Sequence, residues 1–283
     1  HELPGSAVFV DEMHTALPSP LWPQVWRWLQ TWTQEWSGYL VLASGSLPCF
    51  WELEEFVDKP VNVPHLLPDR LRQRLIDAEG ERIRYAASEK PMSPDDLVEF
   101  VLNKPGPRVL ILNTVQSAAY IADRIRHKGK DVMHLSTALA PEHRDRIVDR
   151  VKERLKYSYK DWTLVATSCV EAGMDFSFRS GFRERASTAS LIQTGGRVSR
   201  GAEHEGAVVW DFRAEGELLT QNPGLALPRR VVQRMFESNK MNTLPPGELA
   251  KQAMRCELTE EGKEDAEALA NAARKMDYPT VGG

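Results

Sequence analysis

Apolar residues divide the chain into short strands separated by helices. Continuous apolar runs predict strands over 7–10, 39–43, 108–113, 132–135, 163–166 and 207–210. Apolar positions recur at helical spacing over 22–36, over 116–128 and in a helix that begins near Pro141. Strands that alternate with helices favour an α/β fold, in which a parallel sheet is flanked by helices on both faces.

Two stretches depart from this pattern. Between residues 57 and 94, several prolines surround the charged segment 69–84, which predicts a connection between two domains. After about residue 228 the pattern is helical, which predicts an appended helical element. The tryptophans of segment 22–36 follow one helix face, so we expect them to pack in a core rather than to stack on nucleobases.

Composition limits the class of protein. Hydrophobic residues make up 42% of the chain, charged residues 27%, and the net charge is −4, as in an ordinary globular protein. No apolar run reaches the roughly 18 residues of a membrane helix, so we expect no membrane segment. The three cysteines form no Cys-x-x-Cys pair, which argues against disulfides or zinc and favours the cytoplasm. Because the chain starts at His1 and enters a strand within ten residues, we expect it to be the later part of a longer protein.

An acidic pair, Asp11 and Glu12, directly follows the strand predicted over 7–10. The carboxyl ends of strands are where ligands bind in open α/β folds. One carboxylate can hold Mg²⁺ while its neighbour positions and deprotonates an attacking water. For this pair alone, a solvated acidic loop is an equally good interpretation.

A second group of polar residues follows the strand predicted over 163–166. Thr167 and Ser168 can donate hydrogen bonds to phosphate oxygens of a nucleic acid, and Gly173 permits a close approach of the backbone. Asp175 could accept a hydrogen bond from a ribose hydroxyl or hold the loop in place. An ordinary turn between a strand and a helix would have the same composition.

Two arginines, Arg197 and Arg200, lie three positions apart and would share one face of a helix. Two guanidinium groups on one face suit the charge of a transferring γ-phosphate. An ordinary pair of surface arginines is the alternative, and for an isolated pair it is the more common one.

These groups occur in a characteristic order. The acidic pair, Ser44-Gly45-Ser46, Asn113-Thr114, segment 165–176 and segment 183–201 resemble motifs II to VI of superfamily 2 helicases. Within that superfamily, Asp-Glu-Met-His at 11–14 and Ser-Leu-Ile-Gln-x-x-Gly-Arg-Val-x-Arg-Gly at 190–201 resemble the helicase–nuclease of type I CRISPR systems. The resemblance extends from residue 7 to about residue 212.

The resemblance implies a role for each matching residue. Asp11 would bind Mg²⁺, and Glu12 would be the catalytic base. Ser44, Ser46 and His14 would couple the nucleotide state to the grip on the DNA strand, and Thr114, Thr167 and Ser168 would contact the DNA backbone. Gly173, Asp175 and Gln193 would bind the nucleotide. Gln193, Arg197 and Arg200 would act on the γ-phosphate. Two positions depart from the family: the usual motif III is Ser/Thr-Ala-Thr, and Thr194 stands where an arginine is usual.

The resemblance also implies an architecture and an activity. Residues 1–60 would be the later part of a first RecA-like lobe, 61–94 a linker, 95–227 a second RecA-like lobe and 228–283 a helical C-terminal element. The whole protein would be an ATP-dependent helicase that moves along single-stranded DNA in CRISPR interference. An RNA-guided surveillance complex would recruit it, and a nuclease domain would precede this chain.

The sequence lacks one part of such a motor. The phosphate-binding loop Gly-x-x-x-x-Gly-Lys-Ser/Thr does not occur, so we expect these 283 residues alone to bind ATP weakly and not to hydrolyse it. A general DExH helicase acting on RNA is one alternative. A non-catalytic module that binds a protein or a nucleic acid is another.

Overall fold

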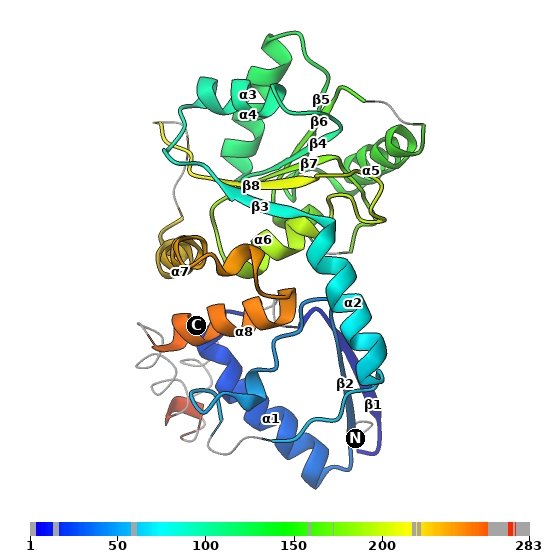
Figure 1. Ribbon diagram of the computed structural model, residues 1–283, viewed down its shortest axis with the longest axis vertical. Coiled ribbons are helices and arrows are strands. Elements are labelled where there is room, and N and C mark those ends of the chain that lie inside the picture. The colour runs from blue at the N-terminus through cyan, green and yellow to red at the C-terminus, as the bar shows by residue number, and fades with distance from the viewer. Residues whose placement is uncertain are drawn as a thin grey trace. The chain divides into compact units, whose positions relative to one another are not determined.

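The computed structural model divides the chain into two compact units. It describes residues 4–13, 17–57, 61–157, 160–171, 173–216, 219, 222–259, 271–273 and 275. Unit 1 consists of His1–Arg74 together with Leu244–Gly283, and unit 2 is the continuous segment Leu75–Thr243 (Figure 1).

Unit 1 contains two parallel strands, β1 (Ala7–Asp11) and β2 (Tyr39–Ala43), with helices α1 (Trp22–Glu35) and α8 (Pro246–Glu257). Its core is aromatic, and the rings of Trp26 and Trp51 stack at 5.5 Å between centroids. The buried members of this core are Met13, Trp22, Trp26, Phe50, Trp51, Phe56, Val57, Met254 and Leu258. Residues at the two ends of the chain therefore share one core.

The tryptophans of α1 are divided between this core and the surface. Trp22 and Trp26 are buried, as the helical pattern predicts. Trp28 and Trp36, in contrast, are 45% and 50% exposed. The prediction that all the tryptophans of this segment pack inside is wrong for these two. Trp36 lies beyond the last residue of α1, where the helical spacing no longer sets its direction.

Unit 2 contains a six-stranded parallel sheet in the order β3-β8-β7-β4-β6-β5. The strands are β3 (Arg84–Ala87), β4 (Arg108–Ile111), β5 (Val132–Leu135), β6 (Thr163–Ala166), β7 (Ser180–Glu184) and β8 (Val208–Phe212). The helices are α3 (Pro94–Leu102), α4 (Val115–His127), α5 (Pro141–Lys156), α6 (Thr188–Gly195) and α7 (Ala226–Glu237), while α2 (Asp69–Arg82) begins in unit 1 and ends in unit 2. The expected α/β fold with a helix-flanked parallel sheet is confirmed.

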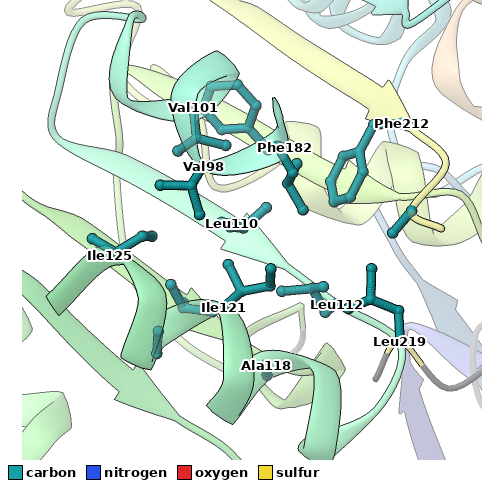
Figure 2. Close-up of a cluster of buried hydrophobic side chains, with 14 residues drawn as sticks. Val98, Val101, Leu110, Leu112, Ala118, Ile121, Ile125, Phe182, Phe212 and Leu219 are labelled. Carbon is teal, nitrogen blue, oxygen red and sulfur yellow. The ribbon is translucent and has the colours of Figure 1, made fainter. Parts of the chain in front are cut away.

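The core of unit 2 lies between the sheet and helices α3 and α4, which cover one face while α6 lies on the other (Figure 1). Val98 and Val101 of α3 and Ile121 of α4 are fully buried against strand residues. Figure 2 shows these side chains around Leu110 of β4, with Phe182 of β7 nearby. This packing fixes the strands whose carboxyl ends carry the polar motifs.

The boundaries of the units differ from those expected. Segment 61–94 is not only a linker, because it contains the whole of α2 and of β3, and β3 pairs with β8 in the sheet. Unit 2 consequently begins at Leu75 rather than at residue 95. The helical residues after 228 also divide, since α7 belongs to unit 2 and α8 to unit 1. Local composition did not indicate these assignments, which depend on strand pairing and on the shared aromatic core.

In the part of the chain that the structure describes, no helix is both long enough and apolar enough to cross a membrane.

Candidate functional site

The acidic pair lies where β1 ends beside β2. Asp11, the last residue of β1, pairs in register with Ala43 of β2, and the Glu12 amide donates to the Ala43 carbonyl at 2.9 Å. Glu12 has a φ of 50°, a left-handed conformation that turns the chain immediately after the strand. The two carboxylates therefore occupy a sharp, hydrogen-bonded turn at the carboxyl end of a strand.

The serines of the Ser-Gly-Ser turn contact this acidic pair. The Ser44 hydroxyl donates to Oε2 of Glu12 at 2.9 Å, and the Ser46 amide donates to the Ser44 oxygen at 3.0 Å. Ser46 is buried, whereas Asp11 is exposed. The resemblance implies a catalytic base at Glu12 and a coupling role for Ser44 and Ser46, and the structure brings these three residues together. His14 lies outside the described residues.

This turn is compatible with a magnesium ion that completes its coordination on a nucleotide. Among the described residues, no group of three or more His, Cys, Asp or Glu side chains could hold a metal by itself. Mg²⁺ at phosphate sites commonly takes one or two protein carboxylates and fills its other positions with phosphate oxygens and water. The exposed Asp11 carboxylate, with Glu12 beside it, supplies a donor set of that kind.

In unit 2, the polar residues predicted to contact nucleic acid lie at the carboxyl ends of β4 and β6. Thr114 caps α4, because its hydroxyl accepts from the Ser117 amide at 3.1 Å and donates to the Ser117 hydroxyl at 2.8 Å. Thr167 is only 6% exposed, with its hydroxyl 3.5 Å from the sulfur of Cys169. Ser168 is exposed. Since β4 and β6 are parallel neighbours, these residues lie at one edge of the sheet.

The loop after β6 and the turn after α6 are in direct contact through Arg197. Its Nε donates to the Val170 carbonyl at 3.0 Å, and its Nη2 donates to the Glu171 carbonyl at 2.7 Å. Arg197 is 9% exposed. The arginine that sequence reasoning placed at a γ-phosphate thus also joins two loops.

Arg200 makes a different contact. Its guanidinium lies 3.0 Å from the carboxylate of Asp175, and both side chains are exposed, at 49% and 86%. Gly173, two residues before Asp175, has a φ of 72°, in the left-handed region that glycine adopts without strain. The Gly173–Asp175 loop and Arg200 are therefore neighbours.

The two arginines do not share a helix face, so that prediction is wrong. Helix α6 ends at Gly195, and Arg197 and Arg200 lie in the turn that follows it. Gln193 lies within the last turn of α6 and is partly buried. The turn directs Arg197 inward and leaves Arg200 at the surface, which gives the two residues different surroundings.

A buried group of charged residues next to these loops was not predicted. Arg183 of β7, which is 3% exposed, forms an ion pair with Glu171 at 2.6 Å, and its Nη1 donates to Oδ1 of Asn113 at 2.6 Å. The Asn113 amide donates to Oε2 of Glu184 at 2.8 Å. Burial raises the pKa of the Glu171 carboxyl, and the positive charge of Arg183 opposes this shift. These contacts join the ends of β4 and β7 to the loop after β6.

A second buried pair continues this group toward α7. Arg185 donates from Nε to Oδ2 of Asp211 at 2.7 Å, and Arg229 of α7 donates to the Arg185 carbonyl at 3.0 Å. Burial raises the pKa of Asp211, while Arg185 opposes the shift. One signal in the sequence could have revealed this group, namely three consecutive charged residues, 183–185, directly after Gly181-Phe182.

Comparison with known proteins finds relatives of part of this chain. Residues 105–203 match the family described as CRISPR-associated nuclease/helicase Cas3, C-terminal. A protein of Thermoproteus tenax named CRISPR-associated helicase Cas3 is 32% identical over 112 residues. Over this segment the chain is similar to the C-terminal part of the Cas3-like helicases. The matched segment includes Thr114, Thr167, Arg197 and Arg200.

The Cas3-like relatives are much longer than the matched segment. The Thermoproteus match covers 39% of this chain and 19% of the relative, and a Haloferax volcanii CRISPR-associated nuclease/helicase Cas3 is 34% identical over 28% of this chain and 8% of its own. The crystal structure of T. fusca Cas3-ADP has a TM-score of 0.63 at 16% identity, covering 97% of this chain and 38% of that one. A chain in the structure titled CRISPR RNA-guided surveillance complex, pre-nicking, has a TM-score of 0.64 at 15% identity, covering 97% and 41%. At these identities the structural likeness shows a shared fold.

Proposed function

We propose that this chain takes part in ATP-driven movement along single-stranded DNA in CRISPR interference. The observation that carries the proposal is the contact between the turn after α6 and the loop after β6, made by Arg197 and by Arg200, within the Cas3-like segment. A buried anchor next to an exposed, weakly held cation suits a site that must bind and release a nucleotide. Such a site accelerates phosphate transfer mainly by placing charge.

Unit 1 supplies the acidic groups for hydrolysis of ATP. Asp11 would hold Mg²⁺, whose charge would neutralise charge on the phosphates. Glu12 would accept the proton of the attacking water, and the hydrogen bond from Ser44 keeps its carboxylate in one orientation. Ser46, hydrogen-bonded to Ser44, and His14 would pass changes at this turn to the residues that hold DNA.

Unit 2 supplies the positive charge. The exposed ion pair of Arg200 with Asp175 costs little to break, because both groups are well solvated. Arg200 would therefore exchange Asp175 for the γ-phosphate of ATP, while Gln193 binds the nucleotide. Arg197 would hold the Gly173–Asp175 loop in place and add its charge to the field at the phosphate.

The hydroxyl groups at the ends of β4 and β6 would hold the DNA backbone. Ser168 is exposed at this edge of the sheet, Thr114 would turn its hydroxyl proton from Ser117 to a phosphate, and the nearly buried Thr167 would fix the conformation of the loop. Contacts of this type position a strand without reading its sequence. We further propose that an RNA-guided surveillance complex recruits the protein and that a nuclease cleaves the strand it moves along.

The test is ATP hydrolysis by the natural polypeptide that contains this chain, with and without single-stranded DNA. Arg200→Ala should lower kcat by about 10³-fold or more while ATP still binds, because the cation acts mainly on the transition state. Arg150→Ala, which removes an exposed arginine of α5, is the matched control and should be neutral. Undiminished turnover in Arg200→Ala would refute the assignment, and stimulation by RNA alone would indicate an RNA helicase. We expect the 283 residues by themselves not to hydrolyse ATP.

A further inference from the structure

Helix α2 ends in a contact with the turn that carries Arg200. The Nη1 group of Arg82, the last residue of α2, donates to the Gly195 carbonyl at 3.0 Å, to the Val198 carbonyl and, more weakly, to the Ser199 carbonyl at 3.4 Å. The Arg82 side chain is 8% exposed. One buried guanidinium thus holds three carbonyl oxygens at the end of α6 and in the turn after it.

A carboxylate on the same helix orients this guanidinium. The Nε of Arg82 donates to Oε2 of Glu79 at 2.8 Å, and its Nη2 donates to Oε1 of the same residue. The planar guanidinium therefore divides its donors, with one edge on the carboxylate and the remaining Nη group on the turn. A lysine ammonium could supply the charge at this place but not this divided geometry.

The turn itself has a conformation that needs support. Ser199 is fully buried and has a φ of 46°, in the left-handed region that a residue with a side chain rarely adopts. Its amide donates to the Phe178 carbonyl at 2.8 Å, and the Arg200 amide donates to the Ser177 hydroxyl at 2.9 Å. Arg82 holds the carbonyl side of the same residues, so the turn is fixed on two sides.

We propose that Arg82, oriented by Glu79, is a positioning residue for Arg200 in ATP hydrolysis. This inference rests on the proposed function. Helix α2 is the segment by which the chain passes from unit 1 into unit 2. Arg82 therefore links the end of this helix by hydrogen bonds to the turn that carries Arg200. A shift of α2 would then change the placement of Arg200 without any contact between α2 and the nucleotide. Displacement of a catalytic group by about 1 Å can lower a rate by about 100-fold.

The first experiment measures the turn directly and needs no activity. Amide hydrogen exchange is compared in the 283-residue chain, its Arg82→Ala variant and Arg74→Ala, which removes an exposed arginine of the same helix. In Arg82→Ala we expect the amides of Val198, Ser199 and Ala202 to exchange about 10-fold faster, because hydrogen bonds from a charged donor are lost. Exchange in β4 and β6 should not change, which shows that the sheet remains folded.

The second experiment measures ATP hydrolysis in the natural polypeptide that contains this chain. Arg82→Ala should lower kcat by about 10- to 100-fold and change the KM for ATP by less than about 3-fold. Arg82→Lys should be nearly as slow, and Arg74→Ala should match the unmodified protein. An unchanged kcat in Arg82→Ala, or full activity in Arg82→Lys, would overturn the positioning role alone. Absence of hydrolysis in the unmodified protein would overturn the proposed function and this inference with it.

Discussion

Replacing Arg183 by methionine isolates the energetic role of the buried charges in unit 2. The ion pair of Arg183 with Glu171 spans 2.6 Å, and the side chains are 4% and 12% exposed. Removal of one partner from a buried pair usually costs about 3–5 kcal/mol, because a charge stays behind without compensation. In this case Glu171 can avoid that cost by binding a proton. The free energy of protonating Glu171 is therefore the upper limit on the destabilisation that its unpaired charge causes.

The limit follows from the pKa. Neutralising a carboxyl group with its ordinary pKa of 4.5 costs about 3 kcal/mol at pH 7 and less than about 1 kcal/mol at pH 5. Loss of the hydrogen bond from Arg183 to Asn113 adds about 1 kcal/mol at either pH. We therefore expect Arg183→Met to destabilise unit 2 by about 3–4 kcal/mol at pH 7 and about 1–2 kcal/mol at pH 5.

The sign of the pH effect is fixed by the direction of the shift. Burial raises the pKa of folded Glu171 above its unfolded value, so the protonated form stabilises the fold fully below pH 4.5. That stability is lost as the pH rises through the folded pKa, and in Arg183→Met only the more weakly acting Arg197 remains to offset the loss. The double variant Arg183→Met/Glu171→Gln should remove the pH dependence and recover most of the stability.

The assay must report on unit 2 alone, because a chain with two units need not unfold in one step. Hydrogen exchange of the slowest amides in β4 and β6, followed with denaturant at pH 5 and pH 7, gives that local free energy. Arg150→Met, at an exposed position of α5, should change it by less than about 0.5 kcal/mol. A loss below 1 kcal/mol at pH 7, or an equal loss at both pH values, would refute the reasoning.

Two further predictions concern packing and a second buried carboxyl. A Cβ on Gly195 would lie 2.4 Å from the Tyr85 hydroxyl, so Gly195→Ala should destabilise unit 2 by about 1–3 kcal/mol, whereas Gly80→Ala, with nothing within 4 Å, should stabilise α2 by about 0.5–1 kcal/mol. Equal effects in thermal unfolding would contradict the packing argument. Burial raises the pKa of Glu257, opposed by the hydrogen bond from Ser19 at 2.5 Å. Stability from its protonated form is present below pH 4.5 and lost as the pH rises through the folded pKa, so Glu257→Gln should gain stability over the unmodified chain between pH 5 and pH 8, measured by hydrogen exchange in unit 1.

The sequence predicted the strands whose residues are all apolar or nearly so. The expected bounds of β2, β5 and β6 agree with the structure, because each strand coincides with a short run of mainly apolar residues. Strand β7 was missed, although all five of its residues are buried. Its Arg183 and Glu184 are charged, and they lie inside only because distant residues neutralise them. Such pairing depends on the folded arrangement and leaves little trace in local hydrophobicity.

The candidate site was predicted only in part, because contacts between distant segments leave little trace in the local sequence. The order of short motifs singled out Glu12, Ser44, Asp175 and Arg200, but it did not predict the hydrogen bond between Ser44 and Glu12 or the ion pair between Arg200 and Asp175. The spacing of Arg197 and Arg200 suggested a helix face, but α6 ends at Gly195, where any larger residue would meet Tyr85. The contact of Arg82 with the turn after α6 could not be predicted from the sequence, because it depends on where α2 ends relative to that turn.

The shared aromatic core of unit 1 has a consequence for the order of folding during synthesis. Trp51 and Met254 pack in one core although about 200 residues separate them in the chain. At about 5–20 residues per second, a ribosome needs about 10–40 seconds to add that interval. Unit 2 is continuous and can fold as it emerges. The tryptophans of the unit 1 core lack the packing of Met254 and Leu258 until that later segment has been synthesised. Chaperones that bind apolar segments would therefore meet α1 before α8 has been synthesised.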